Sequence, residues 1–409
     1  MTAFDFDTHV VDNLPAPAAK WTGFARHNFI GGHNAPESIV ASQLADCARD
    51  VLTREAQSLA FYNVGHGPQG YMPLREWLRD KLDHQAGIKC TTDEILVTSG
   101  SSPAIDLVSR VMLSPGDTVV VEQSNYGGVL RRLERLKCDM ISLELDEGGM
   151  RMDQLERALS DLKAKGKKAK YIYTIPTVQN PTATIMPLDR RQEMLRLAEA
   201  HDTAIFEDEC YSDLIWTGER PPAIYALDET GRTIFTSTFS KSIAPALRVG
   251  YLVAKWPFLS RAIACKSDAG SGMLEQMTLA EFCPKYFDGH LASLIKLLEN
   301  KRDVLIEALN ENFGTTVEFT HPPGGIFLWV KFPDTVDTSE LTKVANAAGI
   351  AVNPGPEWSV HHPEGNRHIR LCYASPSPDD IRQGVSELAD VCHDRFGVPL
   401  RSANRARQT

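Results

Sequence analysis

The sequence predicts an α/β protein with a three-layer large domain, built on a mainly parallel seven-stranded sheet, and a smaller α+β domain. Seven short runs in the middle of the chain are rich in β-branched and aromatic residues, and most are continuously apolar, as strands buried on both faces are. Helical patterns lie between several of these runs, which is typical of a parallel sheet covered by helices. The chain has 409 residues, 43% of them hydrophobic, which is enough for more than one domain of about 150 residues.

The predicted strands follow one another at 95–99, 118–122, 140–145, 171–175, 203–207, 233–238 and 249–254. The predicted helices among them span 104–113, 128–136, 152–162 and 190–200. Later in the chain, a helical pattern at 291–312 precedes strands at 325–332 and 368–374 and a helix at 379–396. We therefore expect an N-terminal arm and part of the small domain at 1–48, a large cofactor-binding domain at 49–290 and a C-terminal small domain at 291–409.

Composition excludes several classes of function. The net charge of −10 does not favour a nucleic acid or an anionic membrane as partner, and the one basic run, 163–170, is typical of a solvated helix end. Eight scattered cysteines form no CxxC pair, so we expect reduced thiols, no metal site and a cytoplasmic protein. We also expect no signal peptide and no membrane span.

The segment 237–248 carries the strongest chemical signal. Lys241 stands among hydroxyl residues between two predicted strands, and Arg248 follows seven residues later. A lysine at the edge of a sheet can lose its proton and form a Schiff base, because burial and a nearby cation disfavour the ammonium. Ser240 and Arg248 suit a phosphate. Together these groups describe a pyridoxal 5'-phosphate (PLP) site, and the alternative is a solvated lysine in a loop.

Polar residues follow the other predicted strands, where ligands of parallel α/β sheets bind. Ser101 and Ser102 follow the first strand and open a helix, which would hold a phosphate or form an ordinary N-cap. Tyr126 follows the second strand and could stack on a flat ring or cover the core. Asn180 follows the fourth strand, either as a hydrogen-bond donor to a ring hydroxyl or in a plain turn before proline.

Asp208 and Tyr211 follow the fifth strand. A carboxylate there suits a protonated pyridine nitrogen, and the phenol suits the neighbouring ring oxygen; surface acids are the alternative reading.

These residues resemble those of PLP-dependent fold-type I, class I/II aminotransferases, nearest to the branch of 2-aminoadipate and kynurenine aminotransferases. The likeness spans nearly the whole chain. The motifs that carry it are Gly31-Gly32, Gly70-Tyr71-Met72-Pro73-Leu74-Arg75, Gln179-Asn180-Pro181-Thr182, Phe239-Ser240-Lys241, Pro323-Gly324-Gly325-Ile326-Phe327 and Arg370-Leu371-Cys372-Tyr373.

The resemblance implies roles for single residues. Lys241 forms the Schiff base and moves the proton, and Asp208 pairs with the pyridine nitrogen. Asn180 and Tyr211 bond the ring oxygen. Tyr126 stacks on the ring. The phosphate ligands are Ser101, Ser102, Ser240 and Arg248. Arg370 binds the α-carboxylate of the substrate, with Gly32 as a backbone contact and Asn180 as a further substrate contact. Arg370 could otherwise form a surface salt bridge.

The resemblance also implies an α-amino acid and a 2-oxo acid as substrates, and a homodimer with shared active sites. Three positions depart from the family pattern. Ala183 stands where glycine is usual, Pro103 stands where a polar residue is common, and Gly65 stands where a tyrosine reaches the partner's phosphate. Tyr62 or His66 could replace that tyrosine.

These departures keep a second reaction open on the same scaffold: C–S cleavage by β-elimination, or decarboxylating deamination, in specialised metabolism. A transcriptional regulator is disfavoured because the first 30 residues or so are not basic. The substrate side chain is not readable, although His33, Asn34, Trp358 and His361 are possible pocket residues. The segment 65–70 matches GxGxxG formally, but Pro68 lies in the turn and we expect Met72-Pro73 to interrupt the helix that a dinucleotide site needs.

Overall fold

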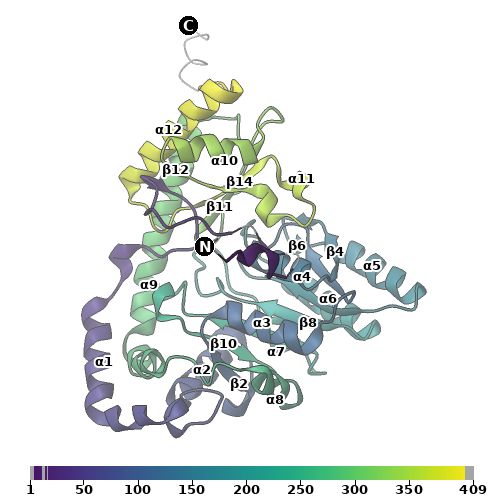
Figure 1. Ribbon diagram of the computed structural model, residues 1–409, viewed down its shortest axis with the longest axis vertical. Coiled ribbons are helices and arrows are strands. Elements are labelled where there is room, and N and C mark those ends of the chain that lie inside the picture. Colours follow the sequence, from purple (N-terminus) through teal and green to yellow (C-terminus); the bar gives the residue numbers. More distant parts are fainter. Residues whose placement is uncertain (1–3, 12–13, 16, 401–409) are drawn as a thin grey trace.

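The computed structural model describes residues 4–11, 14–15 and 17–400, and its largest element is a seven-stranded sheet (Figure 1). Its strands are β2 (Ile95–Thr98), β3 (Thr118–Glu122), β4 (Asp139–Leu143), β7 (Ala169–Thr174), β8 (Ala204–Asp208), β9 (Thr233–Thr238) and β10 (Gly250–Val253). Their spatial order is β2-β10-β9-β8-β7-β3-β4, and β10 alone runs antiparallel to its neighbours in this sheet. The mainly parallel sheet predicted from the seven apolar runs is confirmed.

Helices cover both faces of this sheet, because successive side chains of a strand point to opposite faces. In β3, Val119 and Val121 join one core cluster and Val120 joins another. One layer contains α3 (Ser101–Met112), α4 (Gly127–Arg135) and α8 (Trp256–Cys265). The opposite layer contains α2 (Met72–Ala86), α5 (Met152–Ala164), α6 (Leu188–Ala200) and α7 (Ile224–Leu227). A short hairpin of β5 (Leu145–Asp146) and β6 (Gly149–Met150) precedes α5.

A smaller sheet lies in the upper part of Figure 1, with antiparallel strand order β11-β14-β13. It comprises β11 (Phe327–Lys331), β13 (Asn353–Pro354) and β14 (His368–Cys372), and the nearby helices are α10 (Thr338–Ala347), α11 (His362–Gly365) and α12 (Pro378–Phe396). β1 (His27–Asn28) pairs in parallel with β12 (Ile350–Ala351), so the N-terminal segment is fixed to this part. The division at 48/49 and 290/291 stays a prediction, and residues 1–3, 12–13, 16 and 401–409 of its outer parts lie outside the described residues.

One helix, α9 (Met273–Asn312), is much longer than the predicted 291–312 and packs against α1 (Ala41–Glu55) and α12. Pro284 lies within it, and a proline normally ends or kinks a helix. Buried residues continue on both sides of Pro284: Phe282 and Phe287 belong to the core next to the large sheet, and Leu298 belongs to the core of the smaller part. The helix is therefore continuous through Pro284 and contributes buried side chains to both cores.

Pro73 lies in the first turn of α2, so Met72-Pro73 begins a helix where we expected an interruption. A proline is tolerated there because the first N–H groups of a helix have no partner within it. Within the described ranges, no helix is long and apolar enough to cross a membrane.

Candidate cofactor and substrate site

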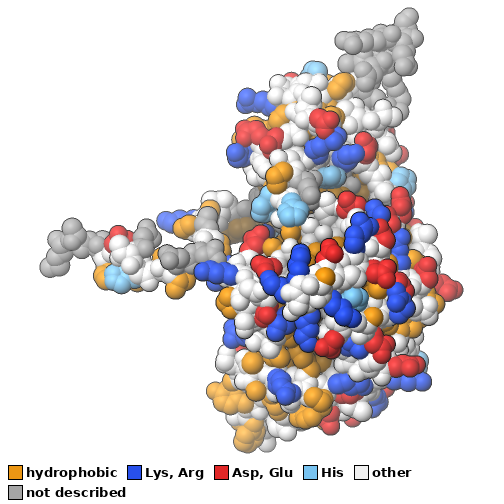
Figure 2. Space-filling model, turned by 90° about the vertical axis from the view of Figure 1, so that its right-hand side faces the viewer, with side chains coloured by type: hydrophobic (Ala, Val, Ile, Leu, Met, Phe, Trp, Pro, Cys, Tyr) orange, Lys and Arg blue, Asp and Glu red, His pale blue; other side chains and the backbone are white. Residues whose placement is uncertain are grey.

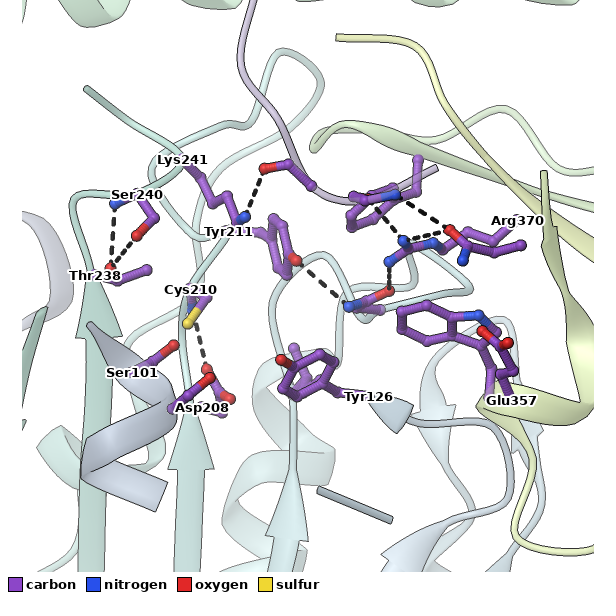
Figure 3. A pocket seen from close by; sticks show the side chains of 18 of the residues that line it. Ser101, Tyr126, Asp208, Cys210, Tyr211, Thr238, Ser240, Lys241, Glu357 and Arg370 are labelled. Atoms are coloured by element: carbon purple, nitrogen blue, oxygen red, sulfur yellow. Dashed lines mark hydrogen bonds between the residues drawn. The ribbon is translucent and has the colours of Figure 1, made fainter. Parts of the chain in front are cut away.

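A cavity of about 340 Å³ lies where the parallel strands of the large sheet end. Every residue predicted for the site lines it: Gly32, Ser101, Ser102, Tyr126, Asn180, Asp208, Tyr211, Ser240, Lys241, Arg248 and Arg370. Figure 3 shows Lys241 and Ser240 on one side, Arg370 on the other, and Tyr211 between them. The structure therefore brings these residues together, while their roles stay predictions.

Lys241 follows β9, and its Nζ donates a hydrogen bond to the carbonyl oxygen of Gly32 at 2.7 Å. Burial lowers the pKa of Lys241, and the charges of Arg370 and Arg248 act in the same direction. A Cβ at Gly32 would lie 2.6 Å from this Nζ, so a side chain there would displace the lysine. Glycine at position 32 thus leaves the room that the end of the Lys241 side chain occupies here.

The groups expected to hold a phosphate surround the N-terminus of α3. Arg248 donates to the carbonyl oxygen of Ser99 at 2.7 Å and to Ser240 Oγ at 3.4 Å. Ser101 and Ser102 form the first turn of α3, whose N–H groups have no partners within the helix. A helix N-terminus with hydroxyls and a guanidinium is a site for an anion, so this end of the cavity fits the phosphate of PLP.

Asp208 is a buried acid at the end of β8. Its carboxylate accepts hydrogen bonds from the Tyr173 hydroxyl at 2.7 Å and from the Cys210 N–H at 3.3 Å, and burial raises its pKa. Within the described residues no lysine, arginine or histidine nitrogen lies within 4.0 Å of it. A buried carboxylate is costly without a cationic partner, so a protonated pyridine nitrogen suits this place.

Asn180 and Tyr211 lie beside Asp208 in the cavity. Asn180 Nδ2 donates to Tyr211 Oη at 3.3 Å, and burial raises the pKa of Tyr211 well above its usual range, so the phenol keeps its proton. Tyr126 also lines the cavity, and Figure 3 shows its ring below that of Tyr211. A Cβ at Gly128 would lie 2.6 Å from Tyr126 Cζ, so glycine at 128 lets the ring fold over the start of α4.

Arg370 reaches the cavity from β14 and is 3% exposed. Its described hydrogen-bond acceptors are neutral: Asn180 Oδ1 at 3.1 Å, Asn353 Oδ1 at 2.9 Å and the carbonyl oxygen of Gly31 at 2.7 Å. Its Cζ lies 3.7 Å from the ring centroids of both Phe327 and Trp358. Burial lowers the pKa of Arg370 to about 10. The alternative considered for Arg370, a surface salt bridge, does not form among the described residues, and the guanidinium lines the cavity.

The three departures from the family pattern lie at different places. Ala183 keeps a positive φ of 60°, so the turn retains the conformation that glycine favours. Pro103 lies in the first turn of α3 and is not part of the cavity wall. A Cβ at Gly65 would meet no other heavy atom within 4 Å. Of its two proposed replacements, His66 accepts a hydrogen bond from the Met72 N–H, whereas Tyr62 is 84% exposed.

Several lining residues were missed from the sequence. They are Gly31, Arg131, Ile175, Cys210, Thr238, Phe327, Asn353 and Glu357. Cys210 and Thr238 could have been found from their places at strand ends. Of the suggested pocket residues, Trp358 lines the cavity. Burial and the nearby charge of Lys241 lower the pKa of His33. Asn34 donates a hydrogen bond to the Ile243 carbonyl oxygen, and His361 is exposed.

Comparisons with known proteins give the family. The model of aminotransferase class I and II matches residues 34–388. An aromatic-amino-acid aminotransferase of Thermococcus litoralis is 34% identical over 90% of this chain and 88% of its own length. A kynurenine aminotransferase of Pyrococcus horikoshii, solved with PMP, is 33% identical with a TM-score of 0.83 and covers 90% of this chain and 91% of its own.

An α-aminoadipate aminotransferase of Thermus thermophilus, solved with N-(5'-phosphopyridoxyl)-L-leucine, is 27% identical with a TM-score of 0.83 over 91% of this chain and 93% of its own. These matches agree with a cavity that offers an anion-binding end, a buried lysine and a buried carboxylate for a pyridine ring. The chain therefore belongs to the class I and II aminotransferase family and is a PLP-dependent enzyme of that family.

Proposed function

We propose that this enzyme transfers the amino group of an α-amino acid to a 2-oxo acid, with Arg370 binding the α-carboxylate of each in turn. The observation that carries the proposal is the setting of Arg370: a buried cation whose described acceptors are all neutral. Its Nε is buried without an acceptor in the described part of the chain, and so is Trp358 Nε1. A substrate carboxylate would satisfy this cation, because charge-assisted bonds to guanidinium are the stronger ones.

Each residue around the cofactor has one task in this proposal. PLP supplies an aldehyde and an electron-withdrawing ring when bound. Asp208 would hold a proton on the ring nitrogen, and Tyr211 and Asn180 would hold the ring oxygen. Lys241 moves the proton between substrate carbon and cofactor, for which its lowered pKa suits it, since a neutral amine can accept a proton.

We propose aromatic amino acids as one class of donor. Tyr126, Phe327 and Trp358 place three aromatic rings in the cavity wall, and the Thermococcus litoralis relative bears the name aromatic-amino-acid aminotransferase. Aromatic rings pack favourably in offset or edge-to-face contact with a ring of the substrate. The β-eliminating and decarboxylating alternatives are not favoured by the comparisons.

A homodimer in the cytoplasm completes the proposal. Figure 2 shows a segment that extends away from the body of the molecule. Among the first 24 residues of the sequence, Phe6, Trp21 and Phe24 are each at least 65% exposed. Such apolar side chains are typical of a surface that a partner covers. We propose Tyr62 as the residue that reaches the partner's phosphate, because its ring is exposed while His66 is engaged. All eight cysteines are free, which suits a reducing compartment.

A single-turnover half-reaction tests the chemistry. The PLP-loaded protein would be mixed with single amino acids, phenylalanine, tyrosine, kynurenine and 2-aminoadipate among them, without any 2-oxo acid. We expect a stoichiometric 2-oxo acid and conversion of the cofactor to its amine form. Catalytic release of ammonia, a thiol or carbon dioxide with the aldehyde form regenerated would contradict the proposal.

A further inference from the structure

Glu122 is a buried carboxylate that lies outside the cavity wall and accepts four hydrogen bonds. It is the last residue of β3 and is 1% exposed. Thr174 Oγ1 and the Ile175 N–H donate to Oε1 at 2.6 and 3.3 Å. The side-chain amides of Asn125 and Gln179 donate to Oε2, each at 2.9 Å. One carboxylate thus holds the end of β7 and the loops that follow β3 and β7.

Both amides also hold segments that carry a cavity residue: Asn125 bonds to Tyr126 itself, and Gln179 bonds within the loop that contains Asn180. The Tyr126 N–H donates to Asn125 Oδ1 at 2.6 Å, so Asn125 fixes the backbone that carries the Tyr126 ring. Gln179 Oε1 accepts from the backbone N–H and hydroxyl of Thr182, at 2.9 and 2.7 Å. These bonds close the loop that contains Asn180 between two anchored residues.

We propose that Glu122 is a positioning residue that sets the spacing between Tyr126 and Asn180, and hence the place of the cofactor ring between them. The proposal rests on the roles given above to those two residues. Asn180 also accepts a hydrogen bond from Arg370, so a shift of its loop reaches the group that binds the substrate carboxylate. Loss of the hydrogen bonds to Glu122 therefore affects both the affinity for the cofactor and the KM for the amino acid.

The charge of Glu122 supports this role. Burial raises its pKa to about 7, although the bonds from Thr174, Gln179 and Ile175 lower it. The ionisable groups that face it include Asp208 on β8, whose charge raises the pKa further, and Tyr173 on β7. All four described partners of Glu122 are donors, so they favour the ionised, acceptor-only form.

Binding of PLP to the apoprotein tests the proposal, with tryptophan fluorescence for the dissociation constant and visible circular dichroism for the seating of the ring. Glu122→Met removes both acceptor oxygens, and with them all four hydrogen bonds, at similar size. We expect a dissociation constant about tenfold higher, a weaker dichroic band and a raised KM, because the Asn125 amide loses its acceptor and the Gln179 amide keeps only the Ser124 carbonyl, at 2.6 Å. Glu122→Gln keeps the hydrogen bonds from the Asn125 and Gln179 amides, since its oxygen can face both, and loses the one from the Ile175 N–H, which its NH2 cannot accept. Its effect is therefore smaller than that of Glu122→Met.

Glu207→Met is the matched control. Glu207 is also a buried glutamate, but it accepts from the Ile224 and Tyr225 N–H groups and its side chain points to the face opposite Asp208. We expect this variant to lose thermal stability while its PLP dissociation constant and dichroic band stay those of the parent protein. Equal losses of affinity in Glu207→Met and Glu122→Met would overturn the positioning role.

A reciprocal exchange gives a second test. Asn125→Asp alone sets two buried carboxylates together and should weaken PLP binding strongly. Combined with Glu122→Gln, the aspartate can accept from the new amide and still accept the Tyr126 N–H, so we expect PLP affinity to recover in part. Recovery is partial because the new NH2 then also faces the amide of Gln179, whose hydrogen bond is lost. A double variant no better than Asn125→Asp alone would contradict the proposal.

Tyr126→Ala and Asn180→Ala separate this proposal from the function on which it rests. If both weaken PLP binding while Glu122→Met does not, the positioning role is wrong and the function stands. If neither of them changes PLP binding or KM, the roles of Tyr126 and Asn180 fail, and the positioning role fails with them.

Discussion

Lys241 and Arg370 donate hydrogen bonds to the carbonyl oxygens of consecutive residues, Gly32 and Gly31, at 2.7 Å each. The two cations come from different sheets, yet one short N-terminal segment fixes the separation between them. That segment is itself held by the pairing of β1 with β12. The distance between the proton-moving amine and the carboxylate-binding guanidinium is therefore set by a third piece of chain.

Replacing Lys241 by alanine should stop turnover while the protein still folds. The variant lacks the amine that bonds the cofactor and moves the proton, so we expect kcat to fall by at least about 10³-fold. The absorbance of lysine-bound PLP should also disappear. Full activity in the half-reaction would refute the proposed role of this residue.

Arg370→Lys should raise the KM for the amino acid by about 30-fold, because a lysine cannot reproduce two parallel hydrogen bonds to a carboxylate. PLP affinity should stay the same. Arg302→Lys is a matched control, since Arg302 also lies over an indole ring, that of Trp216, at 5.2 Å but outside the cavity. Steady-state kinetics with both variants would check the difference, and an unchanged KM in Arg370→Lys would contradict it.

Asn353→Asp should weaken substrate binding more than Asn353→Ala. The aspartate would place a carboxylate 2.9 Å from Arg370, where it competes with the carboxylate of the substrate. We expect KM to rise about tenfold in Asn353→Asp, since a buried charged hydrogen bond must be displaced. The ratio of the two KM values decides the matter, and equal values would show that competition is not the cause.

Tyr62→Ala should lower PLP affinity about fivefold, the size of one hydrogen bond, if the phenol reaches the partner's phosphate. The effect should depend on protein concentration through the dimer, which sedimentation velocity would follow. Tyr286→Ala serves as control, because Tyr286 is an exposed tyrosine on α9 at 40% exposure. A monomer that binds PLP as tightly as the parent protein would rule out the shared site.

Stability should fall as pH rises from about 4.5 to 8, in part because of Glu207. Burial and the charge of Glu209 raise the Glu207 pKa to about 8, so in this range the folded protein holds a proton that the unfolded chain has lost. The contribution is fully present below the unfolded pKa and is lost as pH passes the folded one. Glu207→Gln should flatten the dependence of Tm on pH, and an unchanged slope would contradict the assignment.

The rule that ligands bind at the carboxyl ends of parallel strands was enough to predict Lys241, Asp208 and Asn180, because those ends meet at one edge of the sheet. Asn353 and Glu357 could not be found in that way. They come from the smaller part, and only the pairing of β13 with β14 and the adjoining 3-10 helix Gly355–Trp358 brings them to the cavity. No local pattern reports such contacts.

The backbone conformation was harder to predict from the sequence than the residues of the cavity. Val178 and Ala183 have φ values of 55° and 60°, a region that β-branched residues and alanine rarely adopt. Their residue types therefore predict a negative φ. The N-terminal half of α9 was missed because Pro284 is a breaker in the sequence, whereas the helix continues with buried residues on both sides of it.

The continuity of α9 makes the two parts of the protein one cooperative unit. Side chains of this single helix complete both the core beside the large sheet and the core of the smaller part. Melting either end removes hydrophobic contacts from the other, so heating should unfold the whole chain in one transition. A fragment that starts at 291 would begin inside the helix and lack its first turns, and so would need the remainder of the chain to fold.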